Sequence, residues 1–289
     1  MSSTIRARAI ALYDAFTHEH HDRRAFMAQM VALAGSAAAA DALILGIAPA
    51  EAAAQQVDPL DPRLKTARTS GTEAGQPIAA YFAALKDDQD SRGYVLIIHE
   101  NRGLNAHIED VARRIALAGF RAIAPDFLTP QGGTPADPDK ARALIGTLDY
   151  DLALAQAVAM AERLRAGPQA RKVGAVGFCW GGAFVNRFAV AAGARLTAGV
   201  SYYGPAPAPT EASKVSARML VHLAGNDARV NATGVPWGDA LKAGGKGEAF
   251  VYPGVEHAFN NDTSTERYNA AAATLAWDRT IGLFKARLT

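Results

Sequence analysis

The chain has 289 residues, of which 49% are hydrophobic and 20% are charged. These proportions are typical of a globular protein and exclude a disordered, fibrous or collagen-like chain. The 30 basic and 28 acidic residues give a net charge of +2, so no electrostatic surface for nucleic acid is predicted. The single cysteine, Cys179, excludes an intrachain disulfide and a cysteine-rich metal site.

Residues 1–54 differ in composition from the rest of the chain and resemble a twin-arginine export signal. The pair Arg23-Arg24 precedes an Ala/Gly/Leu-rich stretch, and small residues near its end fit a signal-peptidase site. We therefore predict a leader and a periplasmic protein; an alanine-rich cytoplasmic helix is the alternative. Asp41 interrupts the apolar stretch, so no stable membrane span is expected.

Two further interpretations concern the region before residue 76. His18, His20 and His21 precede the arginine pair, and we interpret them as a solvated part of the leader rather than as metal ligands. The polar, proline-containing residues 55–75 are interpreted as a linker, and residues 76–289 as one domain.

From residue 93 onward, short apolar runs alternate with segments that carry apolar residues at helical spacing. The apolar runs predict strands at 93–99, 121–124, 172–176, 197–203, 218–224 and 248–252. The helical patterns predict helices at 107–118, 138–166, 181–193, 235–243 and 266–285. This alternation predicts an α/β fold with a mostly parallel sheet and helices on both faces. Chemistry is then expected at the carboxyl ends of the strands.

A nucleophile elbow is predicted at residues 177–181, whose sequence is Gly-Phe-Cys-Trp-Gly. Glycine at 177 and 181 removes the Cβ atoms that would collide at so sharp a strand-to-helix turn. The N-terminus of the following helix favours a thiolate at Cys179. A buried structural cysteine is the alternative.

A thiolate nucleophile needs a base and a group that orients the base. Asp227 follows one predicted strand and His257 follows the last one, in the chain order that this elbow type uses. We predict a triad of Cys179, His257 and Asp227. Glu256 and Asp239 are rival orienting residues, and they are disfavoured by adjacency to His257 and by a mid-helix position, respectively.

The oxyanion hole is predicted at two backbone N–H groups, those of Asn101 and Trp180. Asn101 follows His99-Glu100, but Gly103 stands where a zinc-binding HExxH helix needs its second histidine. No metal and no cofactor are predicted.

Taken together, these motifs resemble the dienelactone hydrolase family, the cysteine-nucleophile branch of the α/β-hydrolases. The resemblance spans residues 76–285 and rests on six segments: 99–105 (His-Glu-Asn-Arg-Gly-Leu-Asn), 124–126 (Ala-Pro-Asp), 177–182 (Gly-Phe-Cys-Trp-Gly-Gly), 202–204 (Tyr-Tyr-Gly), 225–227 (Gly-Asn-Asp) and 257–259 (His-Ala-Phe). It implies an α/β-hydrolase fold and a carboxymethylenebutenolidase-like hydrolase of a small-molecule lactone or ester.

The resemblance also implies residue roles. Cys179 would be the nucleophile that forms a thioester, His257 its base and Asp227 the orienting acid. Glu100 would match the family glutamate that contacts the resting thiol and is displaced when substrate binds.

One departure concerns substrate binding. The family holds its substrate's carboxylate with arginines, one of them shortly after the catalytic histidine, whereas Asn260-Asn261 stand there in this chain and Arg267 follows later. Arg142, Tyr203 and Phe259 are the candidate substrate contacts. The missing arginine predicts that neutral esters are accepted at least as well as acidic ones.

Two alternatives remain open at the level of sequence. A non-catalytic, thiol-sensing protein would also use a reactive cysteine, although it lacks a second cysteine to resolve the oxidised form. Thioester or peptide hydrolysis would use the same residues, because pocket loops decide the substrate.

Overall fold

The computed structural model describes residues 3–18, 22–49, 55–87, 92–166 and 170–289. Its strands are β1 (Leu64–Glu73), β2 (Gln76–Leu85), β3 (Tyr94–Ile98), β4 (Arg121–Asp126), β5 (Val173–Phe178), β6 (Ala198–Tyr202), β7 (Arg218–Ala224) and β8 (Gly247–Tyr252). Its helices are α1 (Ser3–His18), α2 (Arg23–Ala34), α3 (Ala37–Ile47), α4 (Ala106–Leu117), α5 (Pro138–Gly146), α6 (Tyr150–Arg165), α7 (Trp180–Ala192), α8 (Ala228–Ala243) and α9 (Ala270–Arg287).

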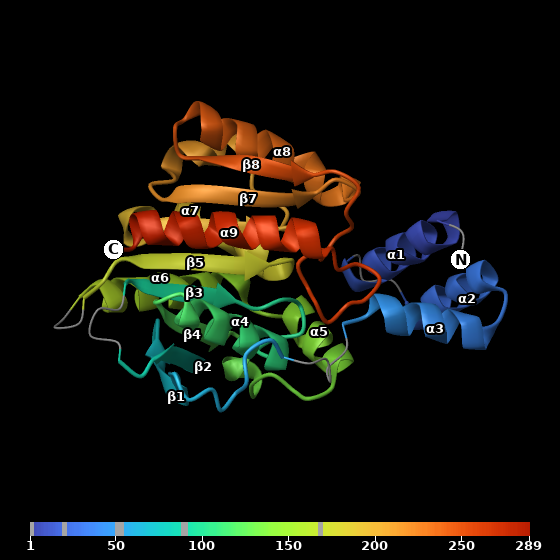
Figure 1. Ribbon diagram of the computed structural model, residues 1–289, viewed down its shortest axis with the longest axis horizontal. Coiled ribbons are helices and arrows are strands. Elements are labelled where there is room, and N and C mark those ends of the chain that lie inside the picture. The colour runs from blue at the N-terminus through green and yellow to red at the C-terminus, as the bar shows by residue number, and fades with distance from the viewer. Residues whose placement is uncertain (1–2, 19–21, 50–54, 88–91, 167–169) are drawn as a thin grey trace.

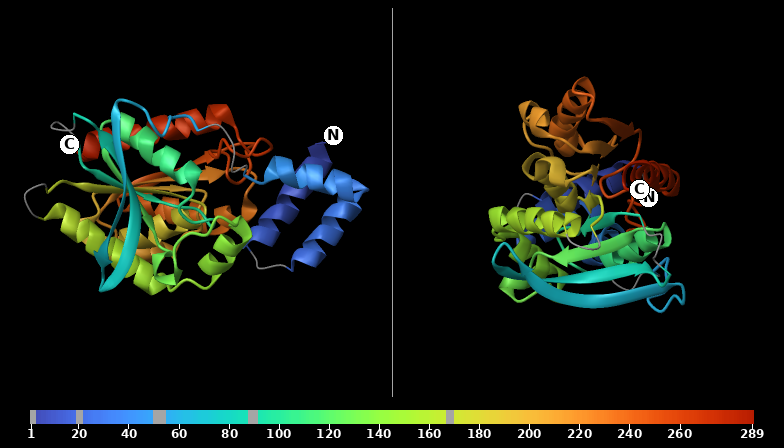
Figure 2. Two further views of the ribbon diagram at one scale, coloured as in Figure 1. Left: turned by 90° about the horizontal axis from the view of Figure 1, so that it is seen from below. Right: turned by 90° about the vertical axis from the view of Figure 1, so that its left-hand side faces the viewer.

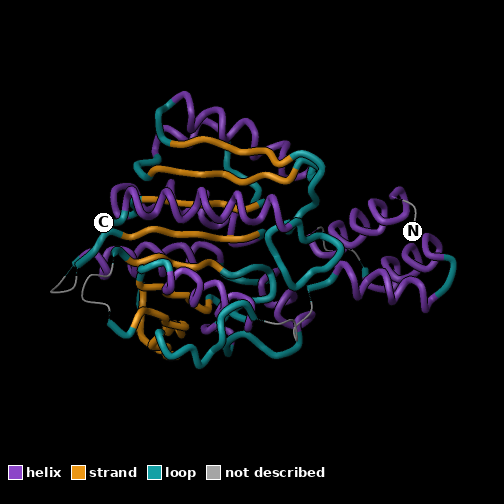
Figure 3. The backbone as a smooth tube through the Cα atoms, viewed as in Figure 1, coloured by secondary structure: helices purple, strands orange, loops and turns teal. Residues whose placement is uncertain are grey.

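Within the described ranges, the strands form one 8-stranded sheet in the order β1-β2-β4-β3-β5-β6-β7-β8 (Figure 3). β1 and β2 pair antiparallel, β2 also runs antiparallel to β4, and all the other neighbours are parallel. Every residue of β3 and β5 is buried, as expected for central strands covered on both faces.

Helices cover both faces of the sheet (Figure 2). One apolar layer joins the sheet to α4 and α9, and a second joins it to α6, α7 and α8. The layered α/β architecture predicted from the sequence is therefore confirmed, and it brings the carboxyl ends of the parallel strands to one edge of the sheet.

The predicted single helix over 138–166 is wrong, because the chain forms two helices, α5 and α6, bent by 94°. Asp149 accepts a hydrogen bond from the backbone N–H of Leu152 and so caps a new helix start. The apolar spacing continues across this break, which is why periodicity alone misses it.

The interpretation of residues 55–75 as a linker is also wrong, since residues 64–73 form the edge strand β1. Ala74 and Gly75 both have positive φ, 51° and 76°, and together make a tight two-residue hairpin turn into β2. The sequence carries neither Asn-Gly nor an apolar alternation at this point, so the usual hairpin signals are missing.

The helices α1, α2 and α3 form a separate bundle, which we call the N-terminal unit (residues 3–49). It lies beyond the carboxyl ends of the strands (Figure 1) and has its own core around Ile10, Phe26 and Met30. No single helix in the described residues is long and apolar enough to cross a membrane; α2 and α3 together have a suitable composition but are bent by 106° at their junction.

Candidate active site

The strand β5 runs directly into α7, and Cys179 occupies the turn between them with φ 55° and ψ −114°. A Cβ at Gly177 would lie 2.1 Å from the carbonyl oxygen of Gly181, and one at Gly181 would lie 2.4 Å from the carbonyl oxygen of Ile98. Only glycine fits at these two positions, so the close approach of α7 to β3 and β5 explains the sequence pattern. The turn has the geometry of a nucleophile elbow.

His257 and Asp227 meet at the same edge of the sheet. Nδ1 of His257 lies 2.5 Å from Oδ2 of Asp227, and both side chains are buried. Asp227 is also the cap of α8, because its Oδ1 accepts a hydrogen bond from the backbone N–H of Val230. One oxygen of the Asp227 carboxylate is therefore bound to the first turn of α8, and the other contacts the imidazole of His257.

The charges of this pair are mutually stabilised. Burial disfavours the charged imidazole, but the charge interaction with Cys179 and the hydrogen bond to Asp227 outweigh it and raise the pKa of His257 to about 10. Burial likewise raises the pKa of Asp227, but the hydrogen bond and charge of His257 bring it below its usual value. Nε2 of His257 is buried and has no hydrogen-bond partner among the described residues, so it is available to a reacting group.

Neither rival carboxylate approaches His257. Glu256 accepts a hydrogen bond from Asn226 Nδ2 at 2.8 Å, and Asp239 is exposed on α8. The structure thus brings Asp227, rather than Glu256 or Asp239, to the histidine.

Glu100 is buried beside the elbow and lines the same small cavity as Cys179. Its Oε2 accepts a hydrogen bond from Asn261 Nδ2 at 3.0 Å, while its Oε1 has no partner in the described part of the chain. Asn261 therefore holds the glutamate that the resemblance assigns to the resting thiol.

The two predicted oxyanion donors both belong to residues close to Cys179. Asn101 lines the cavity beside the cysteine. Trp180 is the first residue of α7, so its N–H has no acceptor within the helix. The indole of Trp180 points into the core and stacks on His99, with ring centroids 5.3 Å apart.

The predicted substrate contacts divide into two groups. Arg142 lines the cavity at Cys179, and so does Arg267, although ten residues separate it from His257. Tyr203 and Phe259 are fully buried and do not line that cavity; the ring of Tyr203 contacts those of His257 and Phe259. A role for these two aromatics in substrate binding stays a prediction. The arginine that the sequence did not place directly after His257 has a counterpart in Arg267, which the fold brings to the cavity.

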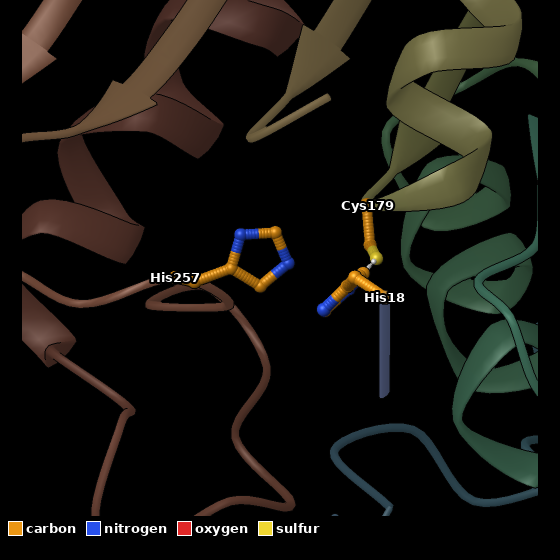
Figure 4. Close-up of side chains that lie close together, drawn as sticks. All are labelled: His18, Cys179 and His257. Carbon is orange, nitrogen blue, oxygen red and sulfur yellow. Dashed lines mark hydrogen bonds between the residues drawn. The ribbon is translucent and has the colours of Figure 1, made fainter. Parts of the chain in front are cut away.

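The sequence interpretation missed His18, which comes from the end of α1. Its Nε2 lies 3.1 Å from Sγ of Cys179, and its ring centroid lies 4.8 Å from that of His257 (Figure 4). The description of His18 as solvated is wrong; His20 and His21 lie outside the described residues. A usable signal was the apolar spacing of Ala9, Ile10, Tyr13 and Phe16, which predicts a packed face on α1.

His18, Cys179 and His257 together form a cluster of metal-ligating side chains. A ring nitrogen of each histidine and the sulfur of Cys179 lie within 4.8 Å of one another. Imidazole and thiolate are ligands that zinc prefers. Assays of this site consequently need a chelator control.

Comparison with known proteins identifies the family. The sequence profile of the dienelactone hydrolase family matches residues 78–288. The chain belongs to the dienelactone hydrolase family. A protein of Escherichia coli strain K12, provisionally named carboxymethylenebutenolidase, is 30% identical over 259 residues, which cover 83% of this chain and 94% of that protein. A similarly named protein of Saccharolobus solfataricus is 28% identical over 246 residues, which cover 71% of this chain and 92% of that protein.

A solved structure agrees with this assignment. A protein of Klebsiella pneumoniae, provisionally named dienelactone hydrolase, superposes with a TM-score of 0.68 at 27% identity, covering 77% of this chain and 98% of that one. The chain thus has the α/β-hydrolase fold and is a hydrolase of the kind that acts on lactones or esters. The family profile starts at residue 78 and so does not include the N-terminal unit.

Proposed function

We propose that this dienelactone hydrolase family member cleaves a small carboxylate-bearing lactone or ester through a Cys179-His257-Asp227 triad and a thioester intermediate. The observation that carries the proposal is the buried 2.5 Å contact between His257 and Asp227, next to a cysteine at an elbow. A histidine held by a carboxylate at one ring nitrogen, with the other nitrogen unpartnered, is oriented to exchange protons with a nucleophile and its leaving group.

The reaction follows from these positions. His257 accepts the thiol proton, and Sγ of Cys179 attacks the carbonyl carbon, whose oxygen becomes an oxyanion held by the N–H groups of Asn101 and Trp180. The C–O bond then breaks, and the leaving alkoxide takes the proton from His257. In a second step His257 deprotonates a water, which attacks the thioester and regenerates the thiol.

Each element has an expected weight. Proton transfer by a positioned histidine contributes roughly 10²–10⁴-fold, and one oxyanion donor about 10²–10³-fold. Asp227 keeps the hydrogen on Nδ1 of His257, so that Nε2 has its lone pair toward the nucleophile in the neutral ring.

Three guanidinium groups support a carboxylate-bearing substrate. Arg102, Arg142 and Arg267 all line the cavity that Cys179 and His257 share. Arginine binds carboxylates through paired hydrogen bonds and stays charged at any physiological pH. We therefore propose an acidic substrate, in place of the expectation that neutral esters are accepted at least as well.

The test is a comparison of wild-type and Cys179→Ala chains with p-nitrophenyl acetate and with a carboxylate-bearing lactone, in the presence of EDTA. We expect turnover by the wild type, complete loss in Cys179→Ala, and loss after iodoacetamide treatment. Mass spectrometry of a quenched reaction should find the acyl group on the peptide that contains Cys179.

A matched variant checks the nucleophile. Cys179→Ser should be severely impaired, because a hydroxyl is far less acidic than a thiol. Near-normal hydrolysis by Cys179→Ala would show that the elbow cysteine is not the nucleophile, and stoichiometric alkylation without turnover would favour a thiol sensor.

A further inference from the structure

The N-terminal unit covers the nucleophile. Cys179 is only 6% exposed, although a nucleophile elbow normally presents its side chain to substrate. The covering group is His18 at the end of α1, 3.1 Å from the sulfur. α1 therefore lies where an ester or lactone would have to bind.

The space that remains is too small for a substrate. The cavity at Cys179 and His257 has a volume of about 30 Å³, and Tyr13, Thr17 and His18 of α1 form part of its wall. Sites for small organic ligands usually enclose roughly 300–1,000 Å³. A larger cavity of about 410 Å³ lies beyond Arg102 but is not lined by Cys179 or His257.

Side chains of α1 contact each of the three arginines at this cavity. Asp14 Oδ1 lies 3.2 Å from Arg267 Nη1, and Tyr13 Oη accepts a hydrogen bond from Arg102 Nη2 at 2.9 Å. The guanidinium carbon of Arg142 lies 4.2 Å from the centre of the Phe16 ring. Asp14 thus places a carboxylate where the proposed substrate would place its own.

His18 contacts the nucleophile through a defined ring nitrogen. Its Nδ1 lies 2.8 Å from the carbonyl oxygen of Asp14, which only accepts hydrogen bonds, so Nδ1 carries the hydrogen. Burial, followed by the charges of His257 and Arg229, lowers the pKa of His18 well below its usual value, so the ring is neutral and Nε2 is an acceptor. Nε2 of His18 therefore faces Sγ of Cys179 with its lone pair, at 3.1 Å.

The N-terminal unit is attached at a second place. The backbone carbonyls of Gly46 and Ile47 accept hydrogen bonds from the backbone N–H of Glu266 at 3.0 Å and from the hydroxyl of Ser264 at 2.6 Å. These anchors hold the end of α3 against the loop that carries Arg267. The unit is therefore docked at two points of the site.

We propose that the N-terminal unit is an inhibitory segment that occupies the substrate site and covers Cys179 until the segment is displaced or cut away. The proposal rests on the proposed function for the identity of the substrate site. The accessibility of Cys179 can nevertheless be measured by its rate of alkylation, which requires no turnover.

The experiment is performed on the full chain. The double variant Tyr13→Ala/Phe16→Ala removes two aromatic contacts from α1 without changing any residue of the hydrolase domain. We expect iodoacetamide to alkylate Cys179 about tenfold faster or more, and kcat/KM for p-nitrophenyl acetate to rise in parallel, because the population with an open site increases. The matched control is Arg8→Ala, an exposed position on the same helix, which should leave both rates unchanged.

Two further variants test the proposal if circular dichroism shows that the double variant is poorly folded. His18→Ala should accelerate alkylation by removing the side chain that covers Sγ of Cys179. Replacement of residues 51–54 by a protease recognition sequence permits cutting after folding, and the cut chain should show both increases.

The outcomes separate the two proposals. Faster alkylation without hydrolysis in any chain would keep the inhibitory segment and overturn the proposed function. Unchanged alkylation in the cut chain and in His18→Ala would overturn the inhibitory segment. Loss of an existing hydrolytic activity on cutting would also overturn it, since α1 would then be part of the working site.

Discussion

Asn261 donates a hydrogen bond from Nδ2 to Oε2 of Glu100, at 3.0 Å, within the buried surroundings of Cys179. The asparagine also accepts at Oδ1 from the backbone N–H and the hydroxyl of Thr263. It therefore connects the loop after His257 to Glu100, the second residue after β3. Asn261 stands where the sequence lacks an arginine for the substrate, and in the structure it orients the carboxylate of Glu100.

Asn261→Asp should lower the free energy of unfolding by about 1.5–3 kcal/mol, because it keeps the acceptor for Thr263 but removes the donor to Glu100. The double variant Asn261→Asp/Glu100→Gln exchanges donor and acceptor and should restore most of the lost stability. Urea unfolding of the two single variants and the double variant measures the coupling. Additive losses of unfolding free energy in this cycle would show that the contact contributes nothing to stability. The activity of the double variant should stay low if Glu100 acts on the thiol.

Asp227→Asn should reduce kcat by up to about 10⁴-fold, because an amide does not fix the His257 tautomer. Asparagine still caps α8, so the unfolding midpoint should change little, whereas Asp227→Ala should lose about 1 kcal/mol more through the missing cap. Steady-state kinetics and thermal unfolding separate the two effects. A fully active Asp227→Asn would remove this residue from the triad.

The raised pKa of His257 makes stability depend on pH. A group whose pKa is higher in the folded state stabilises the fold fully below its unfolded pKa of about 6.5 and loses that contribution as the pH rises through the folded value of about 10. Urea unfolding at intervals from pH 6 to pH 10 should show this decline. It should be smaller in Cys179→Ala, which lacks the sulfur charge, and an equal decline in both chains would contradict the coupling.

Export remains a prediction. Arg23 and Arg24 are exposed at the start of α2, so a receptor can reach them while the helix is folded. Replacement of both by lysine should keep the protein in the cytoplasm, because twin-arginine recognition needs the guanidinium groups. Fractionation and N-terminal sequencing in the native host check this, with the mature chain expected to begin between residues 50 and 57; an intact N-terminus in the periplasm would exclude cleavage.

Much of the hydrolase domain was predictable because its signals are local. Buried parallel strands are continuous apolar runs, and the glycines at 177 and 181 respond to backbone contacts made within one turn. Cys179, Asp227 and His257 each follow an apolar run that predicts a strand, so their positions at strand ends could be predicted as well. Strand β7 agrees with its predicted bounds of 218–224.

The errors concern features that depend on distant partners. Arg267 reaches the cavity because the loop after His257 folds back, and His18 reaches Cys179 because α1 packs across the site. No spacing in the sequence relates residues 18 and 179. The polar strand β1 is defined only by pairing with β2, which its own sequence does not specify.

The position of β1 at the rim of the sheet has a consequence for self-association. Eight of its ten residues are exposed, among them Lys65, Arg68 and three threonines. An outer strand offers backbone groups to any second chain, and charged side chains oppose the close approach that strand addition needs. Growth of this sheet from one molecule into the next is thus discouraged at the β1 rim, and any dimer of the protein should be built on a different surface.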